Sequence, residues 1–262
     1  MKTDEIVVAD ELTTTSLLDL AERRIAAIHV AGYYNGDIAE GAANKLLTHS
    51  ARGTYHKELT SSVGRVHMPF VDTKHDPELT AKYHEGALDA IRDLRSTFDP
   101  YPAPIDLVRL HLDELWPSGA HVLRLRGKTC FVGGVRVFEP KTSRFYAHND
   151  FITQETDAPE ISKVSEQLVA NLYLKVPEEG GELLLWLRDP SPVEQQQILE
   201  VEGIMPDQIE PPNLTLRPKA GDLILFSSKM LHAVNSVEGT HRVGAAAFIA
   251  VENESTPLRL WS

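Results

Sequence analysis

The first half of the chain, up to about residue 128, shows helical patterns separated by stretches without a clear period. Apolar residues at helical spacing predict three amphipathic helices, over residues 13–28, 77–98 and 105–115. A short apolar segment at residues 5–10 predicts an edge strand. Residues 31–75 are polar and rich in Gly, Tyr and His, and their pattern predicts no particular secondary structure.

The second half of the chain is dominated by short apolar or alternating segments bounded by turn residues. These segments predict strands over residues 131–138, 144–151, 171–176, 182–187, 223–226 and 242–251. Many short strands with turn signals between them favour an antiparallel sandwich or barrel. We therefore expect an α+β protein that forms a single catalytic domain over 1–262. Its N-terminal half, about 1–128, is helical and irregular, and its β core spans about 129–252.

Three residues in the predicted core are suited to hold one metal ion. His148 and Asp150 are separated by one residue, so on an extended segment their side chains lie on the same face. His232 supplies a distant second imidazole. Two histidines and one carboxylate leave three positions of an octahedral metal open, as in non-haem Fe(II) oxygenases. An isolated His-x-Asp is more often a surface pair, so the prediction depends on the combination.

A second His-x-Asp, His111-Leu112-Asp113, tests this reasoning. It falls in a segment of helical spacing, where residues two apart point about 200° away from each other and cannot chelate one ion. His111 is therefore predicted to be an ordinary residue of a helix face. The remaining histidines lack a spacing typical of metal ligands, and the single cysteine, Cys130, excludes a thiolate zinc site and an internal disulfide.

Arg242 follows His232 by ten residues and is suited to bind a dicarboxylate. A guanidinium group matches a carboxylate with two parallel hydrogen bonds, which lysine cannot do. Alternation places Arg242 on the same strand face as Gly244 and Ala246, and these small residues leave room for a ligand.

Several of these elements together resemble an iron(II)- and 2-oxoglutarate-dependent oxygenase of the double-stranded β-helix (jelly-roll) class. The matching elements are His148-Asn149-Asp150, residues 171–174, residues 180–183, residues 219–226, His232 and Arg242. The resemblance covers roughly residues 85–250. It is strongest to the small-molecule tailoring branch, which includes hydroxylases of free or N-acylated amino acids and stand-alone halogenases.

The resemblance implies a jelly-roll core buttressed by helices, with Fe(II), 2-oxoglutarate and O₂ as cofactor and co-substrates. It implies that His148, Asp150 and His232 bind the iron and that Arg242 binds the C5 carboxylate of 2-oxoglutarate. Asn171 and Tyr173 share one strand face and are candidates for contacts to 2-oxoglutarate or to an iron ligand, although a tyrosine in such a strand is commonly a core residue.

Arg136 and Trp186 each have a functional and a structural interpretation. Arg136 shares a strand face with Phe138, and either contacts substrate or co-substrate or closes an ion pair. Trp186 is predicted to pack in the core rather than to stack on a substrate.

The function implied is hydroxylation of an amino acid, an amino-acid derivative or a related natural-product intermediate, with release of succinate and CO₂. Desaturation, ring closure and epimerisation stay open, as does a protein-residue hydroxylase of the prolyl-hydroxylase type. A halogenase of this branch has Gly or Ala in place of the carboxylate ligand, so Asp150 counts against that activity. A non-catalytic jelly-roll binding module is disfavoured because it has no need for all three metal ligands and the arginine.

Composition limits the partners. The formal net charge is −12, from 26 basic and 38 acidic residues, which repels phosphate backbones and counts against a nucleic-acid substrate. No apolar run approaches the roughly 20 residues of a membrane span, and the N-terminal residues do not resemble a signal peptide. We therefore expect a cytoplasmic enzyme with a small-molecule substrate; the sequence does not predict its oligomeric state. The long segment 189–218 is expected to be a partial lid.

Overall fold

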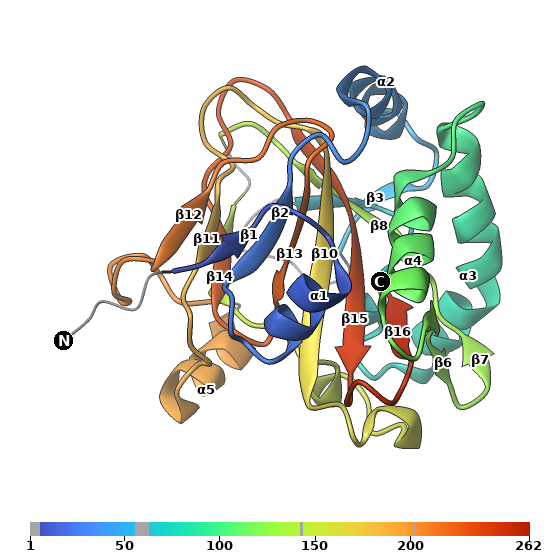
Figure 1. Ribbon diagram of the computed structural model, residues 1–262. Coiled ribbons are helices and arrows are strands. Elements are labelled where there is room, and N and C mark those ends of the chain that lie inside the picture. The colour runs from blue at the N-terminus through green and yellow to red at the C-terminus, as the bar shows by residue number, and fades with distance from the viewer. Residues whose placement is uncertain (1–5, 56–62, 142–143, 202) are drawn as a thin grey trace.

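Most of the described β-strands form a major and a minor sheet (Figure 1). The computed structural model describes residues 6–55, 63–141, 144–201 and 203–262. The major sheet has the order β1 (Val8–Ala9), β2 (Ala27–Val30), β13 (Leu223–Ser227), β10 (Glu166–Lys175), β15 (Arg242–Val251), β8 (Gly134–Phe138), β4 (Val63–Val66) and β3 (Arg52–Thr54). It is extended by β16 (Leu258–Trp261), which pairs with β15, and by β5 (Ala120–Val122), which pairs with β16.

The minor sheet has four strands in the order β12 (Leu214–Leu216), β11 (Leu183–Leu185), β14 (His232–Val234) and β9 (Phe145–His148). Its neighbouring strands are antiparallel. One cavity is lined by residues of β8, β10, β13 and β15 from the major sheet and of β9, β11 and β14 from the minor sheet. The cavity therefore lies between the two sheets. A short separate ribbon is formed by β6 (Arg124–Leu125) and β7 (Lys128–Thr129).

The two central strands, β10 and β15, are almost completely buried, and this explains their sequence. Nine of ten residues of β15 and eight of ten of β10 are buried. A strand covered on both faces has no solvent side, so its sequence reads as a continuous apolar run rather than an alternation. The structure accordingly begins β10 at Glu166, five residues before the predicted strand.

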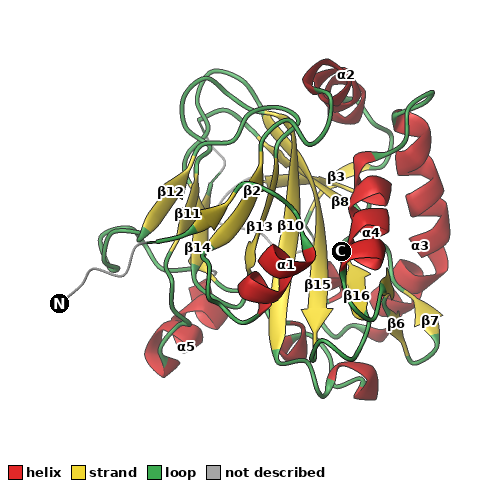
Figure 2. Cartoon of the chain, viewed as in Figure 1, coloured by secondary structure: helices red, strands yellow, loops and turns green. Residues whose placement is uncertain are grey.

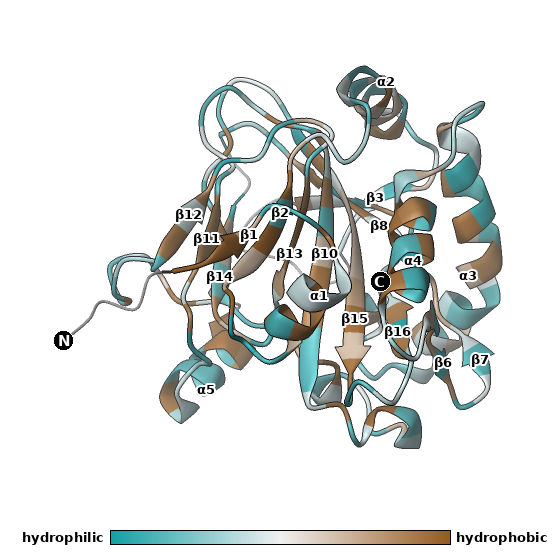
Figure 3. Ribbon diagram, viewed as in Figure 1, coloured by the Kyte–Doolittle hydropathy of each residue, from teal (hydrophilic) through white to brown (hydrophobic). Residues whose placement is uncertain are grey.

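Helices cover the outer face of the major sheet (Figure 2). Helices α1 (Thr14–Ala21), α2 (Gly36–Leu47) and α4 (Pro104–Leu115) each contact β10, and α3 (Pro77–Thr97) packs against α2. Hydrophobic and hydrophilic turns alternate along α3 in Figure 3, as expected for a helix with one buried stripe. The side chain of Asp76 caps its first turn by accepting hydrogen bonds from the backbone N–H groups of Glu78 and Leu79. The predicted helices at 77–98 and 105–115 are thus confirmed.

The helix predicted over 13–28 is wrong in its second half. The helix ends at Ala21, Arg23 adopts a positive φ of 58°, and Ala27–Val30 forms strand β2 instead. This strand pairs antiparallel with β13 and parallel with β1. Helical spacing of Ile25 and Ile28 was therefore coincidental, and pairing with the sheet overrides it. The predicted edge strand at 5–10 is confirmed in part, since Val8–Ala9 begins the sheet order and Glu5 lies outside the described residues.

Two segments contain more regular structure than the sequence predicted. Residues 31–75 hold α2, β3, β4 and the 3₁₀ helix η1 (Phe70–Thr73). Residues 189–218 hold α5 (Pro192–Val201) and β12. Two shorter 3₁₀ helices, η2 (Ile152–Gln154) and η3 (Pro159–Ile161), follow β9.

The predicted α+β class and double-stranded β-helix fold are confirmed. The major sheet nevertheless recruits strands from residues 8–66 and 258–261, so it extends beyond the core predicted at 129–252. Among the described residues, no helix is both long and apolar enough to cross a membrane.

Candidate active site

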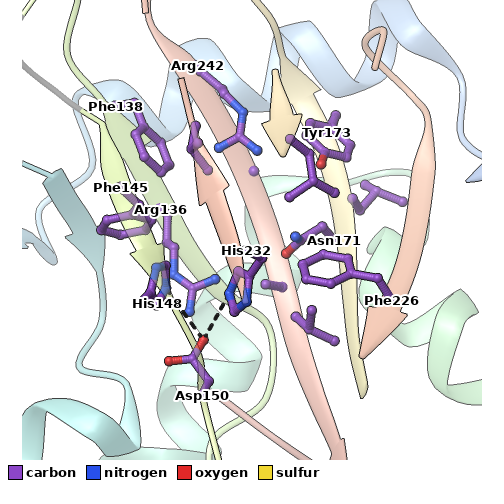
Figure 4. Close-up of a pocket in the computed structure, with 16 residues that line it drawn as sticks. Arg136, Phe138, Phe145, His148, Asp150, Asn171, Tyr173, Phe226, His232 and Arg242 are labelled. Carbon is purple, nitrogen blue, oxygen red and sulfur yellow. Dashed lines mark ion pairs between the residues drawn. The ribbon is translucent and has the colours of Figure 1, made fainter. Parts of the chain in front are cut away.

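His148, Asp150 and His232 meet at the end of the minor sheet. His148 is the last residue of β9 and His232 the first of β14, and the two are directly paired across the antiparallel strands. Their ring centroids are 4.3 Å apart. Asp150 follows β9, and its Oδ2 lies 3.9 Å from Nε2 of His148 and 3.5 Å from Nε2 of His232 (Figure 4, dashed lines). The structure thus brings together the three predicted ligands, with one potential ligand atom from each within 4.8 Å of the others.

The tautomers of His148 and His232 leave Nε2 of each ring free to bind a metal. Nδ1 of His148 lies 2.8 Å from the carbonyl oxygen of Tyr146, and Nδ1 of His232 lies 3.0 Å from that of Met230. A carbonyl only accepts, so each Nδ1 carries the proton and donates. Each Nε2 therefore has a free lone pair beside the Asp150 carboxylate. Backbone carbonyls commonly fix metal-binding histidines in this way.

The electrostatics of the cluster agree with a cation site. Burial, together with the neighbouring His232, lowers the pKa of His148 to about 4, so the ring is neutral at pH 7. Burial alone raises the pKa of Asp150, but the adjacent His232, together with His148 and the charge of Arg136, outweighs burial and holds this pKa well below its usual range. Two imidazoles that bind through Nε2 and one anionic carboxylate are a donor set that fits Fe(II).

The backbone around Asp150 is held by a buried glutamine that the sequence analysis missed. Gln167, fully buried on β10, donates from Nε2 to the carbonyl oxygen of Asp150 at 3.1 Å and accepts from the N–H of Ile152 at 2.7 Å. The backbone N–H of Asp150 donates to the carbonyl oxygen of Ser228 at 2.8 Å. A polar residue inside an otherwise apolar run was the available signal, but the predicted strand began only at residue 171.

Arg242 closes the other end of the cavity between the sheets, which we call the inner cavity and which has a volume of about 40 Å³. The Arg242 side chain is buried, and its guanidinium lies between the rings of Phe138 and Tyr173, at 4.7 and 5.0 Å from their centroids. Gly181 sits against it at a positive φ of 72°, where an added Cβ would lie 3.1 Å from Cδ of Arg242. The turn between β10 and β11 therefore needs glycine to make room for this arginine.

The inner cavity offers donors without acceptors. Arg242 forms no ion pair with a carboxylate of the described residues, its Nε has no hydrogen-bond partner, and the Tyr173 hydroxyl has none either. Burial lowers the pKa of Arg242 from its usual value. A buried cation without a counter-charge is costly, so this end of the cavity is built to receive an anion. A carboxylate fits it.

The predicted face relations around the inner cavity hold. Gly244 and Ala246 line it together with Arg242, as alternation on one strand requires. Asn171 and Tyr173 also both line it, and Figure 4 shows Asn171 beside Phe226 and Tyr173 near Arg242. Trp186 does not line this cavity or the larger one described below. It is buried in a separate hydrophobic cluster, and its indole N–H donates to the carbonyl oxygen of Glu210. This agrees with the predicted packing role.

A second, larger cavity of about 460 Å³ adjoins His148 and Asp150, and we call it the outer cavity. Both cavities are lined by Arg136, Phe145, His148 and Asp150. These four residues therefore lie at the boundary between the two cavities. Figure 4 shows the Arg136 guanidinium pointing toward Asp150 and the two histidines. Ile198 and Leu199 of α5 also line the outer cavity, which places the segment predicted as a partial lid at its wall.

A second group of two histidines and one carboxylate, His49, His67 and Asp93, was not predicted. Its donors are arranged differently. Nδ1 of His49 accepts from the backbone N–H of Ala51 at 3.1 Å, so the neutral ring carries its proton on Nε2, which faces Asp93 at 3.4 Å. That nitrogen has no lone pair for a metal, so the group is read as a hydrogen-bonded cluster. His111 also behaves as predicted, since it sits on α4 and pairs with the Tyr33 hydroxyl.

Comparisons with known proteins agree with this site. The family model described as the carrier-protein-independent halogenase WelO5 matches residues 7–262. An L-gamma-glutamyl-L-propargylglycine hydroxylase of Streptantibioticus cattleyicolor is 26% identical over 268 residues, which cover 98% of this chain and 95% of the relative. An N-substituted L-amino acid dioxygenase of Burkholderia ambifaria has a similar structure, with a TM-score of 0.63, 18% identity, and coverage of 95% of this chain and 91% of that one. Its complex with alpha-ketoglutarate matches with a TM-score of 0.60, 15% identity and the same coverage.

Proposed function

The chain belongs to the family of the carrier-protein-independent halogenase WelO5, and from this premise we propose that it is an Fe(II)- and 2-oxoglutarate-dependent oxygenase that hydroxylates an amino-acid derivative. One observation carries the proposal. Two Nε2 lone pairs and the Asp150 carboxylate converge at one end of a cavity, and a buried guanidinium without a counter-ion lies at the other. This is the arrangement that a metal and a dicarboxylate need together.

His148, Asp150 and His232 would bind the iron on one face and leave three positions open for co-substrate and O₂. When bound, iron supplies the redox chemistry, in which O₂ and 2-oxoglutarate give succinate and CO₂ while one oxygen atom enters the substrate C–H bond. The Arg242 guanidinium would bind the C5 carboxylate, with the Tyr173 hydroxyl as a second donor. Asn171 would add a polar contact along the co-substrate.

The apolar walls of the inner cavity have their own role. Phe138, Phe226 and Leu183 line it beside the polar groups. They exclude water, which strengthens the pairing of Arg242 with a carboxylate because the surroundings have a low dielectric constant.

Two observations favour hydroxylation: the name of a relative and the presence of Asp150. The Streptantibioticus relative is named a hydroxylase of an amino-acid-derived dipeptide. Halogenases of this branch lack the carboxylate ligand, whereas Asp150 is present here beside both histidines. Hydroxylation is therefore favoured over halogenation. Desaturation, ring closure and epimerisation would use the same residues, and product mass distinguishes hydroxylation, which adds one oxygen atom, from all three.

The size of the outer cavity supports a small-molecule substrate. Its volume of about 460 Å³ falls within the roughly 300–1,000 Å³ common for small-ligand pockets. A role in natural-product biosynthesis, a cytoplasmic location and the absence of a nucleic-acid partner stay predictions from the sequence, as does the organisation of the chain as one catalytic domain.

The direct test is an anaerobic titration of the protein with Fe(II) and 2-oxoglutarate, monitored by the weak visible metal-to-ligand charge-transfer band. We expect the band to form at one iron per chain, and to be absent in His148→Ala. Admission of O₂ should then convert 2-oxoglutarate to succinate. A protein that binds neither iron nor 2-oxoglutarate under these conditions would overturn the proposal.

A further inference from the structure

The outer cavity contains a cation beside the metal ligands that no described carboxylate neutralises. Arg136 extends from β8, and its guanidinium stacks on Phe248 at 5.5 Å from the ring centroid. It forms no ion pair with any carboxylate of the described residues. Burial works against its charge, but the neighbouring Tyr55 and the carboxylates of Asp150 and Glu155 raise its pKa above the usual value. Arg136 is thus a charged and poorly hydrated donor facing the cavity.

The same cavity contains a carboxyl group in a matching situation. Glu155 ends the short helix η2, and its Oε2 is buried without a hydrogen-bond partner. Burial, together with the charge of Asp150, raises the pKa of Glu155 to about 8, and Arg136 opposes this only in part. A buried carboxylate normally has a paired cation or several donors. Among the described residues, none pairs with Glu155.

Arg136 and Glu155 interact electrostatically at a distance. Each shifts the pKa of the other, yet they form no ion pair. The other described carboxylates lining this cavity are engaged, because Asp72 pairs with Arg65 at 3.0 Å and Asp150 faces the two histidines. The cavity space therefore lies between one cation without a paired carboxylate and one carboxyl group without a paired cation.

We propose that the outer cavity binds the zwitterionic group of an amino acid, with the carboxylate at Arg136 and the ammonium at Glu155. This inference rests on the proposed function and specifies its substrate. A guanidinium binds a carboxylate with two hydrogen bonds, and a carboxylate accepts from an ammonium. The remaining wall combines polar and apolar side chains, and the apolar ones, Phe70, Val71, Phe145, Phe151, Ile198 and Leu199, offer contacts to an apolar part of the substrate. A substrate with a blocked amine or a blocked carboxyl group leaves Glu155 or Arg136 without its partner and is rejected.

The test uses the full chain loaded anaerobically with Fe(II) and 2-oxoglutarate. The probes are L-alanine, L-valine, L-leucine, L-methionine and L-phenylalanine, each as the free amino acid, the amide and the N-acetyl form. Dissociation constants come from calorimetry and from the change of the charge-transfer band. We expect at least one free amino acid to bind 10-fold or more tightly than both of its blocked forms.

Substitutions assign each half of the recognition. In Arg136→Met, the free amino acid should bind no better than the amide, while the affinity for the amide is unchanged. In Glu155→Gln, the free amino acid should bind no better than the N-acetyl form. Arg144→Met and Asp157→Asn, which remove charges outside the cavity lining, should keep the wild-type ratios. Normal binding of 2-oxoglutarate by each variant shows that it is folded.

The outcomes separate two failures. Absence of the charge-transfer band in wild type refutes the proposed function itself. A normal band with no free amino acid preferred over its blocked forms, or with the preference kept in both variants, refutes only the zwitterion site.

Discussion

His148 and His232 face each other across β9 and β14, and each donates from Nδ1 to the carbonyl oxygen two residues earlier in its own chain segment. The repeated local hydrogen bond turns both Nε2 atoms the same way, toward Asp150. Strand register and ring tautomer therefore prepare the metal site before any metal binds. His49 has the opposite tautomer, and this difference distinguishes the two histidine clusters.

The first prediction concerns these two clusters. His148→Ala or His232→Ala should weaken Fe(II) binding by more than the roughly 10–100-fold that is typical of a change outside the ligand shell. His49→Ala should leave iron binding unchanged. Iron content after anaerobic loading and desalting is the measurement, with circular dichroism to confirm folding. Equal iron loss in His49→Ala would show that the tautomer argument is wrong.

The second prediction concerns the anion site at Arg242. Arg242→Ala should raise the dissociation constant of 2-oxoglutarate by about one to three orders of magnitude, because loss of one partner of a buried charge pair typically costs about 2–5 kcal/mol. Arg242→Lys should recover only part of the affinity, since lysine keeps the charge but lacks the fork of donors. Iron binding should survive in both variants. If Arg242→Ala binds 2-oxoglutarate with wild-type affinity, another basic residue such as Arg136 binds the C5 carboxylate.

The third prediction concerns Gln167. Gln167→Met keeps the approximate size of the side chain but leaves the N–H of Ile152 without its buried partner and removes one of two side-chain hydrogen bonds to the carbonyl oxygen of Asp150. A buried unsatisfied group costs about 1–3 kcal/mol, so the free energy of unfolding should fall by about that amount. Iron affinity should fall by roughly 10–100-fold because the Asp150 loop is no longer fixed.

Urea denaturation and an iron titration measure the two effects. Gln196→Met on the exposed face of α5 is the matched control and should change neither. Full iron affinity in a destabilised Gln167→Met protein would mean that the glutamine supports the fold but not the ligand.

The residues that meet at the two ends of the inner cavity were predictable because their relations are local in sequence or fixed by strand alternation. His148 and Asp150 are two residues apart, and Arg242 shares its face with Gly244 and Ala246. The distant His232 could be selected because it precedes an arginine at a fixed interval. The helix that ends at Ala21 was overextended because periodicity alone does not register that Ala27–Val30 pairs with β13.

The residues that sequence reasoning missed act across long separations. Gln167 reaches Asp150 only because β10 passes under the loop after β9, and nothing in the local pattern of residues 166–170 reveals that contact. Glu155 stands out only once its burial is known. Residues of this kind gain their role from tertiary packing, and a sequence pattern cannot identify their partners.

The fourth prediction is a pH dependence caused by Glu155. Its pKa is about 8 in the folded protein, against 4.5 ordinarily, so between these values the folded chain keeps a proton that the unfolded chain has lost. Its contribution to stability is therefore complete below about pH 4.5 and is lost as the pH rises to about 8. The metal-free wild type should lose about 1–3 kcal/mol relative to Glu155→Gln between about pH 5 and pH 8, because the partly exposed side chain realises only part of the full shift.

Urea denaturation of both proteins across this range measures the difference and cancels titrations that they share. Parallel stability curves would show that Glu155 is ionised in the folded protein at neutral pH. Such a result would leave the zwitterion site with a pre-formed anion rather than one completed on binding.

The fifth prediction concerns Asp150, the residue that separates this chain from halogenases of its own family. Asp150→Gly removes the only carboxylate among the three metal ligands and vacates a coordination position that chloride can occupy with a similar net charge. Hydroxylation should collapse, because both iron retention and the geometry of the remaining ligands depend on that carboxylate. Chlorination need not appear in its place, since chloride also requires supporting contacts and a substrate placed closer to halide than to hydroxyl.

Product mass in chloride buffer and in chloride-free buffer, with wild type in parallel, tests this prediction. Asp150→Asn, which keeps the shape but not the charge, shows whether the negative charge or the vacant space matters. Since the carboxylate oxygen lies within 4 Å of Nε2 of both histidines, a glycine variant that still hydroxylates at the wild-type rate would mean that iron does not bind between them. A chlorinated product from wild type would have the same consequence, because a carboxylate bound to iron leaves no position for chloride beside the co-substrate and O₂.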